Sequence, residues 1–239
     1  MRNIWPYIVG VVLLIGGAIA IYNGISTSEP IIGNGTQTTS LNPAKNDEVS
    51  KLSVSPDASF SEIPIDKTDL IVGNKSAPVT IIEYSSLTCP HCSDFHKKVL
   101  PIIKREFVET NKVRLVYRDF PLDQWALRAS IIARCAGPER RYRFIQTFFL
   151  QQEQWTSGDP AAGLVALAKL GGLTTASLEK CLSDQKMIDT VIKERLAATQ
   201  QFAIRSTPTI IVNGDLYSGG LDVEQLRSVI KEKLKTPKG

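Results

Sequence analysis

The chain has 239 residues, of which 43% are hydrophobic and 22% are charged. These are ordinary values for a globular protein, so wholesale disorder and a fibrous repeat are excluded. The formal net charge is +4 without a basic block, so the composition gives no support for nucleic-acid binding. Four cysteines are too few for a disulfide scaffold. Two of them lie three positions apart, a spacing that favours chemistry over structural bridging.

The amino terminus, residues 1–22, has the pattern of a signal peptide or signal anchor. Arg2 is followed by an almost wholly apolar run over residues 4–22. The sequence Ala-Ile-Ala at 18–20 fits cleavage after Ala20, which would give a soluble exported protein. The run is also long enough to span a bilayer and to stay as an anchor, in which case it would be the only contact with the membrane. Both outcomes predict that the rest of the chain works in the periplasm or another extracytoplasmic space, free or anchored to the inner (cytoplasmic) membrane.

A polar tract follows the apolar run. Residues 23–60 are rich in Gly, Ser, Thr, Asn and Pro, and their apolar residues show no period of 2 or 3.6. This composition is typical of a flexible linker or tether. We therefore expect a folded domain at residues 61–239.

The first half of that domain predicts a βαβ unit. A β-branched and aromatic run at 79–84 indicates a buried strand, and 113–117 indicates a second. The segment between them has the apolar period of a helix, with Pro101 inside it, and proline should kink the helix by removing a backbone donor. Strand, helix and strand in this order imply parallel pairing.

A helical insertion and a ββα half complete the expected α/β fold. The insertion covers about 122–203, with helices at 139–152, 175–183 and 186–203 and another capped by Asp123. The remaining elements are predicted from turn and cap signals: a strand at 208–212, an Asn-Gly turn at 213–214, a return strand at 215–218, and a last helix opened by the capping box of Asp222 and Gln225. Arg140, Arg141 and Arg143 are expected on a solvated face, and Phe148, Phe149 and Trp155 in the core.

The sequence Cys89-Pro90-His91-Cys92 carries the candidate chemistry, because it lies after a strand and opens a helix. Free backbone N–H groups and the helix dipole favour a thiolate at Cys89, the nucleophile of disulfide exchange. Cys92 lies one turn further on, where it can attack a mixed disulfide and release the partner. His91 can add a positive or hydrogen-bonding group beside the sulfur.

Other interpretations of this motif are a metal site and a structural disulfide. A zinc site needs four ligands, and the chain has no second CxxC and only His91 and His96 as histidines. A copper site from Cys89, Cys92 and His96 is conceivable, because His96 lies one turn beyond Cys92. A purely structural disulfide across one helical turn would be unusual. The βαβ context and the export signal favour redox chemistry.

Taken together, the motifs resemble the DsbA family of thiol-disulfide oxidoreductases, which have a thioredoxin fold with a helical domain inserted between the βαβ and ββα halves. The matching motifs are Gly73, Ala77-Pro78-Val79-Thr80, Glu83 at the end of its strand, Cys89-Pro90-His91-Cys92, Phe95-His96, Phe120-Pro121-Leu122, Thr207-Pro208-Thr209 and Asn213-Gly214. The resemblance covers about residues 64–235.

The resemblance implies roles for individual residues. Cys89 would form mixed disulfides with substrate and Cys92 would resolve them. A cis Pro208 would face the pair, and the Thr207 backbone would bind substrate peptide. Glu83, six residues before Cys89, would tune the thiol pKa or relay protons; alternatively it is a solvated carboxylate on an edge strand.

Cys135 and Cys181 lie on two helices of the insertion. An exported compartment favours a second, structural disulfide between them, as some DsbA relatives have. The alternative is two buried free cysteines that behave as small hydrophobic residues.

These observations predict an exported oxidase that donates the Cys89–Cys92 disulfide to reduced, newly translocated proteins. The resemblance implies no bound cofactor and a membrane quinone-linked partner of the DsbB kind for reoxidation. The alternatives are a disulfide isomerase or reductase on the same fold, a copper- or zinc-binding chaperone using Cys89, Cys92 and His96, and a passive surface antigen. Thr207 bears on the first alternative, because the best-studied oxidases carry valine before the cis-proline and isomerases carry threonine.

Overall fold

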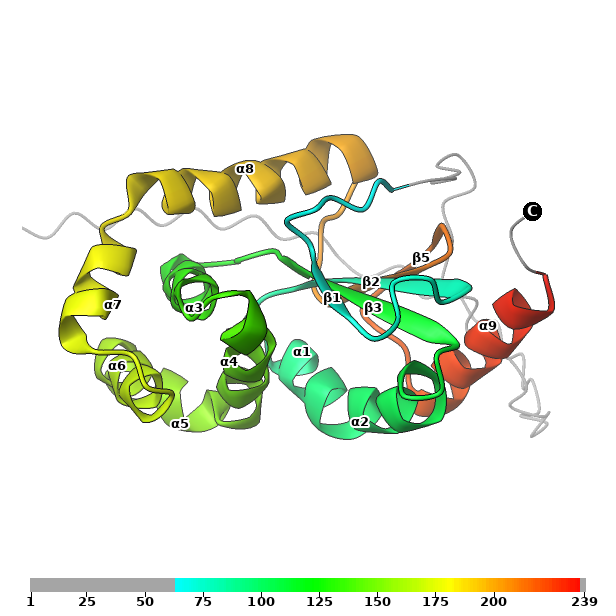
Figure 1. The fold of residues 1–239 in the computed structure, drawn as a ribbon, viewed down its shortest axis with the longest axis horizontal. Helices are drawn as coiled ribbons and strands as arrows, with labels where there is room; N and C mark the ends of the chain where they lie inside the picture. The colour runs from blue at the N-terminus through cyan, green and yellow to red at the C-terminus, as the bar shows by residue number, and fades with distance from the viewer. Residues whose placement is uncertain (1–62, 237–239) are drawn as a thin grey trace, which may run out of the picture. The chain divides into compact units, whose positions relative to one another are not determined.

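A computed structural model of the protein describes residues 63–236. Its centre is a five-stranded mixed sheet with the order β1-β3-β2-β4-β5 (Figure 1). The strands are β1 (Leu70–Val72), β2 (Val79–Ser85), β3 (Val113–Asp119), β4 (Thr209–Val212) and β5 (Asp215–Ser218). β2 and β3 are parallel and all other neighbours are antiparallel, which confirms the predicted βαβ unit and the ββα half.

β1 was not predicted. It has three residues, too few to show an alternating pattern, and it pairs antiparallel with β3 at the edge of the sheet. Tertiary pairing makes it a strand, because its local sequence carries no strand signal of its own.

The helical run between β2 and β3 is interrupted by two wider turns. It consists of α1 (Pro90–Asp94), the π-helical turn η1 (Phe95–Val99), α2 (Leu100–Ile103) and the π-helical turn η2 (Lys104–Val108). In η1 the Leu100 N–H donates to the Phe95 carbonyl, five residues back, and Pro101 follows in the first turn of α2. The π turn therefore lies directly before Pro101, which removes one backbone N–H donor from the helical run.

Six helices lie between β3 and β4, which confirms the insertion of a helical domain into a thioredoxin fold (Figure 1). They are α3 (Gln124–Cys135), α4 (Pro138–Leu150), α5 (Gln152–Thr156), α6 (Pro160–Leu170), α7 (Thr175–Leu182) and α8 (Gln185–Phe202). Asp123 caps α3 by accepting from the N–H groups of Trp125 and Ala126. The single helix expected at 139–152 was wrong at its end, because a break at Gln151 separates α4 from the short α5.

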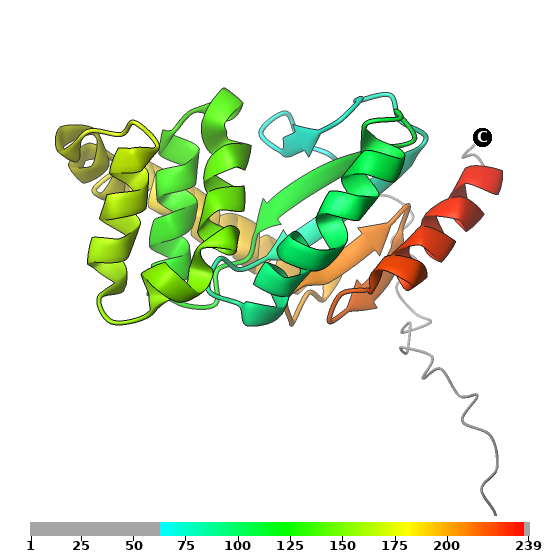
Figure 2. The ribbon, with the colours of Figure 1, turned by 90° about the horizontal axis from the view of Figure 1, so that it is seen from below.

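Helices cover both faces of the sheet. On one face, α1, α2 and α9 (Val223–Lys235) lie side by side (Figure 2), and Ile103 and Leu226 pack against Ile81 and Leu115. On the other face α8 crosses the strands (Figure 1), where Ala198 joins the cluster around Ile82 and Val116. Alternate residues of β2 therefore face opposite helical layers.

The turn and cap at the C-terminal end agree with their sequence signals. Asn213 and Gly214, which join β4 and β5, have φ angles of 46° and 98°. Positive φ at both positions is the requirement of a type I′ turn, which Asn-Gly meets best. Asp222 and Gln225 form the reciprocal capping box that opens α9.

One expected solvated arginine is buried. Arg140 and Arg143 are exposed, whereas Arg141 is only 9% exposed. Arg141 Nη2 donates to Asp119 Oδ2 at 2.9 Å, and Arg134 Nη2 donates to the same oxygen at 2.6 Å. The solvated face predicted for Arg141 was therefore wrong, because a buried carboxylate at the end of β3 needs cationic partners.

Between residues 63 and 236, none of the helices is both long enough and apolar enough to cross a membrane. The expected signal or anchor segment at 1–22 and the expected linker at 23–60 lie outside the described residues.

Candidate active site

Cys89 and Cys92 occupy the first turn of α1, as the motif predicted. Cys89 is the N-cap residue of α1, and Pro90 takes the first helical position, where its missing N–H costs nothing. Both cysteines are free thiols in the structure. Cys89 is 6% exposed, while Cys92 is fully buried. Cys89 is therefore the more accessible of the two residues.

The two thiols have opposite pKa shifts. The pKa of Cys89 is lowered to about 5, chiefly because the Cys92 thiol donates to its sulfur, with the backbone N–H groups of Cys92 and His91 and the Thr207 side chain acting in the same direction. The pKa of Cys92 is raised, first by burial and then by the neighbouring Cys89 sulfur. Cys89 is therefore the thiolate at neutral pH and Cys92 the proton donor to it.

Thr207 contacts Cys89 immediately before Pro208 and the start of β4. The Thr207–Pro208 peptide bond is cis. The Cys89 thiol donates to the Thr207 carbonyl oxygen with a sulfur–oxygen distance of 3.3 Å. The Thr207 hydroxyl is buried and has no hydrogen-bond partner in the thiol form, so it is free to donate to a thiolate at Cys89.

A groove of about 200 Å³ begins beside this pair. Its lining residues are His91, Asp94, Phe95, Lys98, Val99, Pro208, Gly219, Gly220, Leu221 and Asp222. The His91 side chain is exposed at its rim. Gly220 has a φ angle of 81°, and a Cβ there would lie 3.0 Å from Pro208 Cγ, so glycine keeps the groove open next to the proline ring.

Glu83 lies on the face of β2 that is covered by α1 and η1. It is fully buried on a central strand, so the alternative of a solvated edge carboxylate was wrong. His96 Nε2 lies 2.9 Å from Oε1 and 3.1 Å from Oε2 of Glu83, and the imidazole stacks on Phe149 with ring centroids 4.0 Å apart. Glu83 thus has a buried polar partner that the sequence did not indicate.

The same contact bears on the metal alternative. His96 turns its Nε2 to Glu83 rather than toward Cys89 and Cys92. Within residues 63–236 no three His, Cys, Asp or Glu side chains are grouped so as to hold a metal ion. The donor set proposed for copper or zinc is therefore not assembled by the fold.

Cys135 and Cys181 are joined by a disulfide that links α3 to α7. Their Cα atoms lie 6.1 Å apart, and the bond closes a sequence separation of 46 residues. The bond lies within the insertion and leaves Cys89 and Cys92 as the two free thiols of the described residues.

Sequence reasoning missed two residues that hold the active-site turn against the insertion. Gln152 is buried, and its Nε2 donates to the carbonyl oxygens of Leu87 at 2.8 Å and Cys89 at 3.0 Å. Ser93 Oγ donates in the other direction, to the Phe149 carbonyl oxygen at 2.8 Å. No local signal could have found them, because a glutamine or serine in a helical segment is ordinarily a surface residue.

Comparison with known proteins shows which family has this fold and this pair of cysteines. A family model described as thioredoxin matches residues 66–232. A Rickettsia typhi protein named as a protein-disulfide oxidoreductase is 30% identical over 196 residues, which cover 80% of this chain and 72% of that protein. The chain belongs to the DsbA-like thiol-disulfide oxidoreductases of the thioredoxin family.

Further relatives agree with this family at lower coverage or identity. A Rickettsia bellii protein named as a protein-disulfide oxidoreductase is 36% identical over 63% of this chain, which spans only 59% of that protein's length. Among solved structures, Wolbachia pipientis alpha-DsbA1 has a TM-score of 0.69 at 27% identity and covers 74% of this chain and 96% of its own. Oxidised BdbD from Bacillus subtilis, at 23% identity, a TM-score of 0.64 and coverage of 72% and 96%, shares the fold.

Proposed function

We propose that this DsbA-like protein is an exported oxidase that transfers the Cys89–Cys92 disulfide to reduced protein substrates. A substrate thiolate attacks Cys89 Sγ, the Cys89–Cys92 bond breaks, and Cys92 leaves and takes up a proton. A second substrate thiolate then attacks the substrate sulfur of the mixed disulfide and expels the Cys89 thiolate. The substrate loses two electrons to form its disulfide, and the enzyme gains them as a dithiol.

The observation that carries this proposal is the low pKa of Cys89, about 5. A thiol of low pKa is a good leaving group in the second step and stabilises the reduced enzyme, which makes the disulfide a stronger oxidant. The groove beside His91 and Pro208 offers both apolar and polar side chains to the substrate chain. The family resemblance implies that the backbone of Thr207 pairs with that chain.

We also propose where the protein works and which partner reoxidises it. The apolar run at residues 4–22 supports export to the periplasm or another extracytoplasmic space, with or without cleavage. Reoxidation of Cys89 and Cys92 requires an electron acceptor, for which we propose a membrane quinone-linked protein of the DsbB kind. The exchange chemistry needs only the two sulfurs, so no bound cofactor is proposed.

Thr207 favours a second candidate function on the same site, a disulfide isomerase or reductase. This candidate rests on the resemblance alone, because isomerases carry threonine before the cis-proline, whereas a donor from Thr207 to the Cys89 thiolate would stabilise the reduced enzyme and strengthen the oxidant. The equilibrium of the purified protein with a glutathione redox buffer separates the two functions. An oxidase is mostly reduced in a buffer at which an isomerase or reductase keeps more of its disulfide.

Trapping of substrates tests the proposed oxidase directly. In Cys92→Ala the Cys89 thiolate can still attack a disulfide of an exported protein and expel one of its sulfurs, and no Cys92 thiol remains to attack the mixed disulfide, so exported proteins should accumulate on Cys89 as adducts visible on non-reducing gels. Cys89→Ala is the matched control and should trap none. Adducts in Cys89→Ala but not in Cys92→Ala would reverse the assigned roles, and adducts in neither would contradict the proposal.

A further inference from the structure

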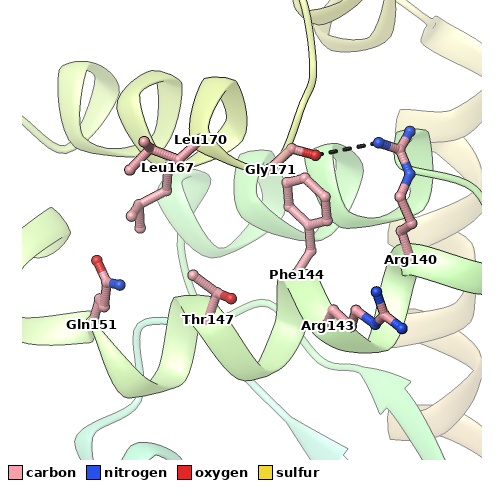
Figure 3. Close-up of a pocket in the computed structure, with 8 residues that line it drawn as sticks. All are labelled: Arg140, Arg143, Phe144, Thr147, Gln151, Leu167, Leu170 and Gly171. Atoms are coloured by element: carbon pink, nitrogen blue, oxygen red, sulfur yellow. Dashed lines mark hydrogen bonds between the residues drawn. The ribbon is translucent and has the colours of Figure 1, made fainter.

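The helical insertion contains a pocket that the thiol chemistry does not use. It has a volume of about 320 Å³ and lies between α4 and the C-terminal end of α6 (Figure 3), at the lower end of the sizes of ligand pockets. Its lining residues are Arg140, Arg143, Phe144, Thr147, Gln151, Leu167, Leu170 and Gly171. None of these residues is acidic.

One end of the pocket is cationic. Arg140 is held in place, since its Nε donates to the Ala136 carbonyl oxygen at 3.0 Å and its Nη1 to the Gly171 carbonyl oxygen at 3.2 Å. Arg143 extends toward the same end (Figure 3), and its side chain makes no hydrogen bond or ion pair with any residue between 63 and 236. Two guanidinium groups without a lining carboxylate are complementary to a carboxylate on a ligand.

The middle of the pocket is apolar. The buried ring of Phe144 forms its base, and Leu170 stands at its rim with 84% of its surface exposed. Gly171 permits this arrangement, because a Cβ there would lie 2.3 Å from Phe144 Cζ. Leu170 therefore extends the apolar lining of the pocket to the protein surface.

The opposite end is polar but uncharged. Thr147 and Gln151 line it (Figure 3), and within the described part of the chain neither side chain makes a hydrogen bond. A hydrocarbon tail would leave these groups unpaired, whereas a peptide backbone supplies donors and acceptors for them. The polar end therefore favours a peptide over a lipid chain.

We propose that this pocket binds an extended peptide segment in which apolar side chains precede a carboxylate, supplied by an acidic side chain or a chain terminus. The carboxylate would lie between Arg140 and Arg143, the apolar side chains between Phe144 and Leu170, and the backbone near Thr147. The pocket would serve as a docking surface for a protein partner separate from the groove beside Pro208. Its occupancy requires no cysteine in the partner and no redox step.

Binding of a cysteine-free peptide tests this proposal independently of thiol exchange. The probe is acetyl-Ser-Leu-Leu-Glu with a free carboxylate, and its twin acetyl-Ser-Leu-Leu-Gln amide lacks both negative charges. Binding to the protein is followed by amide chemical shifts, and the largest shifts are expected at Thr147 and Gly171. Arg143→Glu and Leu170→Ser change exposed side chains, so the fold should be kept, and each should weaken binding by about tenfold or more.

Matched variants and competing ligands decide the outcome. Arg105→Glu and Ile192→Ser change an exposed arginine and an exposed apolar residue on η2 and α8, and they should leave binding unchanged. Equal binding of the amide twin, equal loss in the control variants, or shifts confined to Gly219 and Gly220 would overturn the proposal. Absence of peptide binding together with Arg143-dependent binding to phosphatidylglycerol vesicles would assign the surface to a membrane instead.

Discussion

At the scale of single residues, burial and the end of a helix separate two chemically identical thiols. Cys89 meets backbone N–H groups at the start of α1 and accepts from the Cys92 thiol, so its negative charge is stabilised. Cys92 lies one turn deeper and is fully buried, where a charge would lose its hydration. Position alone therefore lowers the pKa of one thiol and raises the pKa of the other.

The thiolate of Cys89 should titrate with a midpoint near pH 5 in the reduced protein. Absorbance near 240 nm, or the rate of alkylation by iodoacetamide, should rise through this pH, and Cys92 should add no second step up to pH 9. The folded pKa lies below the ordinary value of 9.0. The resulting stability is therefore fully present above pH 9 and is lost as the pH falls through 5. The free energy of unfolding of the reduced protein minus that of Cys89→Ser gives the contribution of the Cys89 thiolate at each pH. A difference that stays constant from pH 9 to 5 would contradict a low pKa at Cys89.

Replacement of His91 by serine should make the protein a weaker oxidant. Serine keeps the backbone N–H that lowers the pKa of Cys89 and removes only the exposed imidazole. The Cys89 pKa should rise and the reduction potential should fall, with each fall of ~30 mV equal to about 1.4 kcal/mol. Equilibration with glutathione measures the potential. If the potential is unchanged or higher in His91→Ser, the helix terminus and Thr207 set it without the imidazole.

At the scale of elements, α1 is held from two sides. On one side, Cys89 follows the end of the β2 strand. On the other, Ser93 of α1 donates to the Phe149 carbonyl of α4, and Gln152 of α5 donates to the Leu87 carbonyl before α1. The inserted helices therefore help to fix the backbone on which the thiolate depends.

Removal of the Gln152 amide should raise the pKa of Cys89. In Gln152→Ala the buried Leu87 carbonyl loses a donor, and the protein should lose about 1–3 kcal/mol of stability. The turn should also loosen, so the 240 nm titration should shift to higher pH and the potential should fall. Gln154→Ala, an exposed change on the same helix, is the matched control. A loss of stability with an unmoved Cys89 titration would limit Gln152 to a structural role.

At the scale of the whole described molecule, one disulfide closes the insertion while the other pair of cysteines remains as free thiols. The Cys135–Cys181 bond joins α3 and α7, the second of which is a short helix of eight residues. A cross-link of this kind stabilises chiefly by restricting the unfolded chain.

Cys135 and Cys181 should stay bonded under mild reduction that opens Cys89–Cys92, because structural disulfides lie at lower potential than catalytic ones. Replacement of both by alanine should lower the free energy of unfolding by about 2–4 kcal/mol for a loop of this length. Substrate oxidation should continue in the double variant. Thiol counting checks the pairing, and four free thiols after mild reduction would contradict it.

Local patterns in the sequence were sufficient for much of this protein. The thiols, the βαβ and ββα halves, the Asn213-Gly214 turn and the Asp222 cap each follow from residues within a few positions of one another, so short-range sterics and hydrogen bonding determine them. Only the tertiary structure decided that β1 is a strand, that Arg141 is buried on Asp119, that Glu83 meets His96 rather than water, and that Gln152 holds the active-site turn. Each of these depends on a contact between distant parts of the chain. A buried polar group needs a partner, and the residues near it in the sequence do not indicate which partner the fold brings to it.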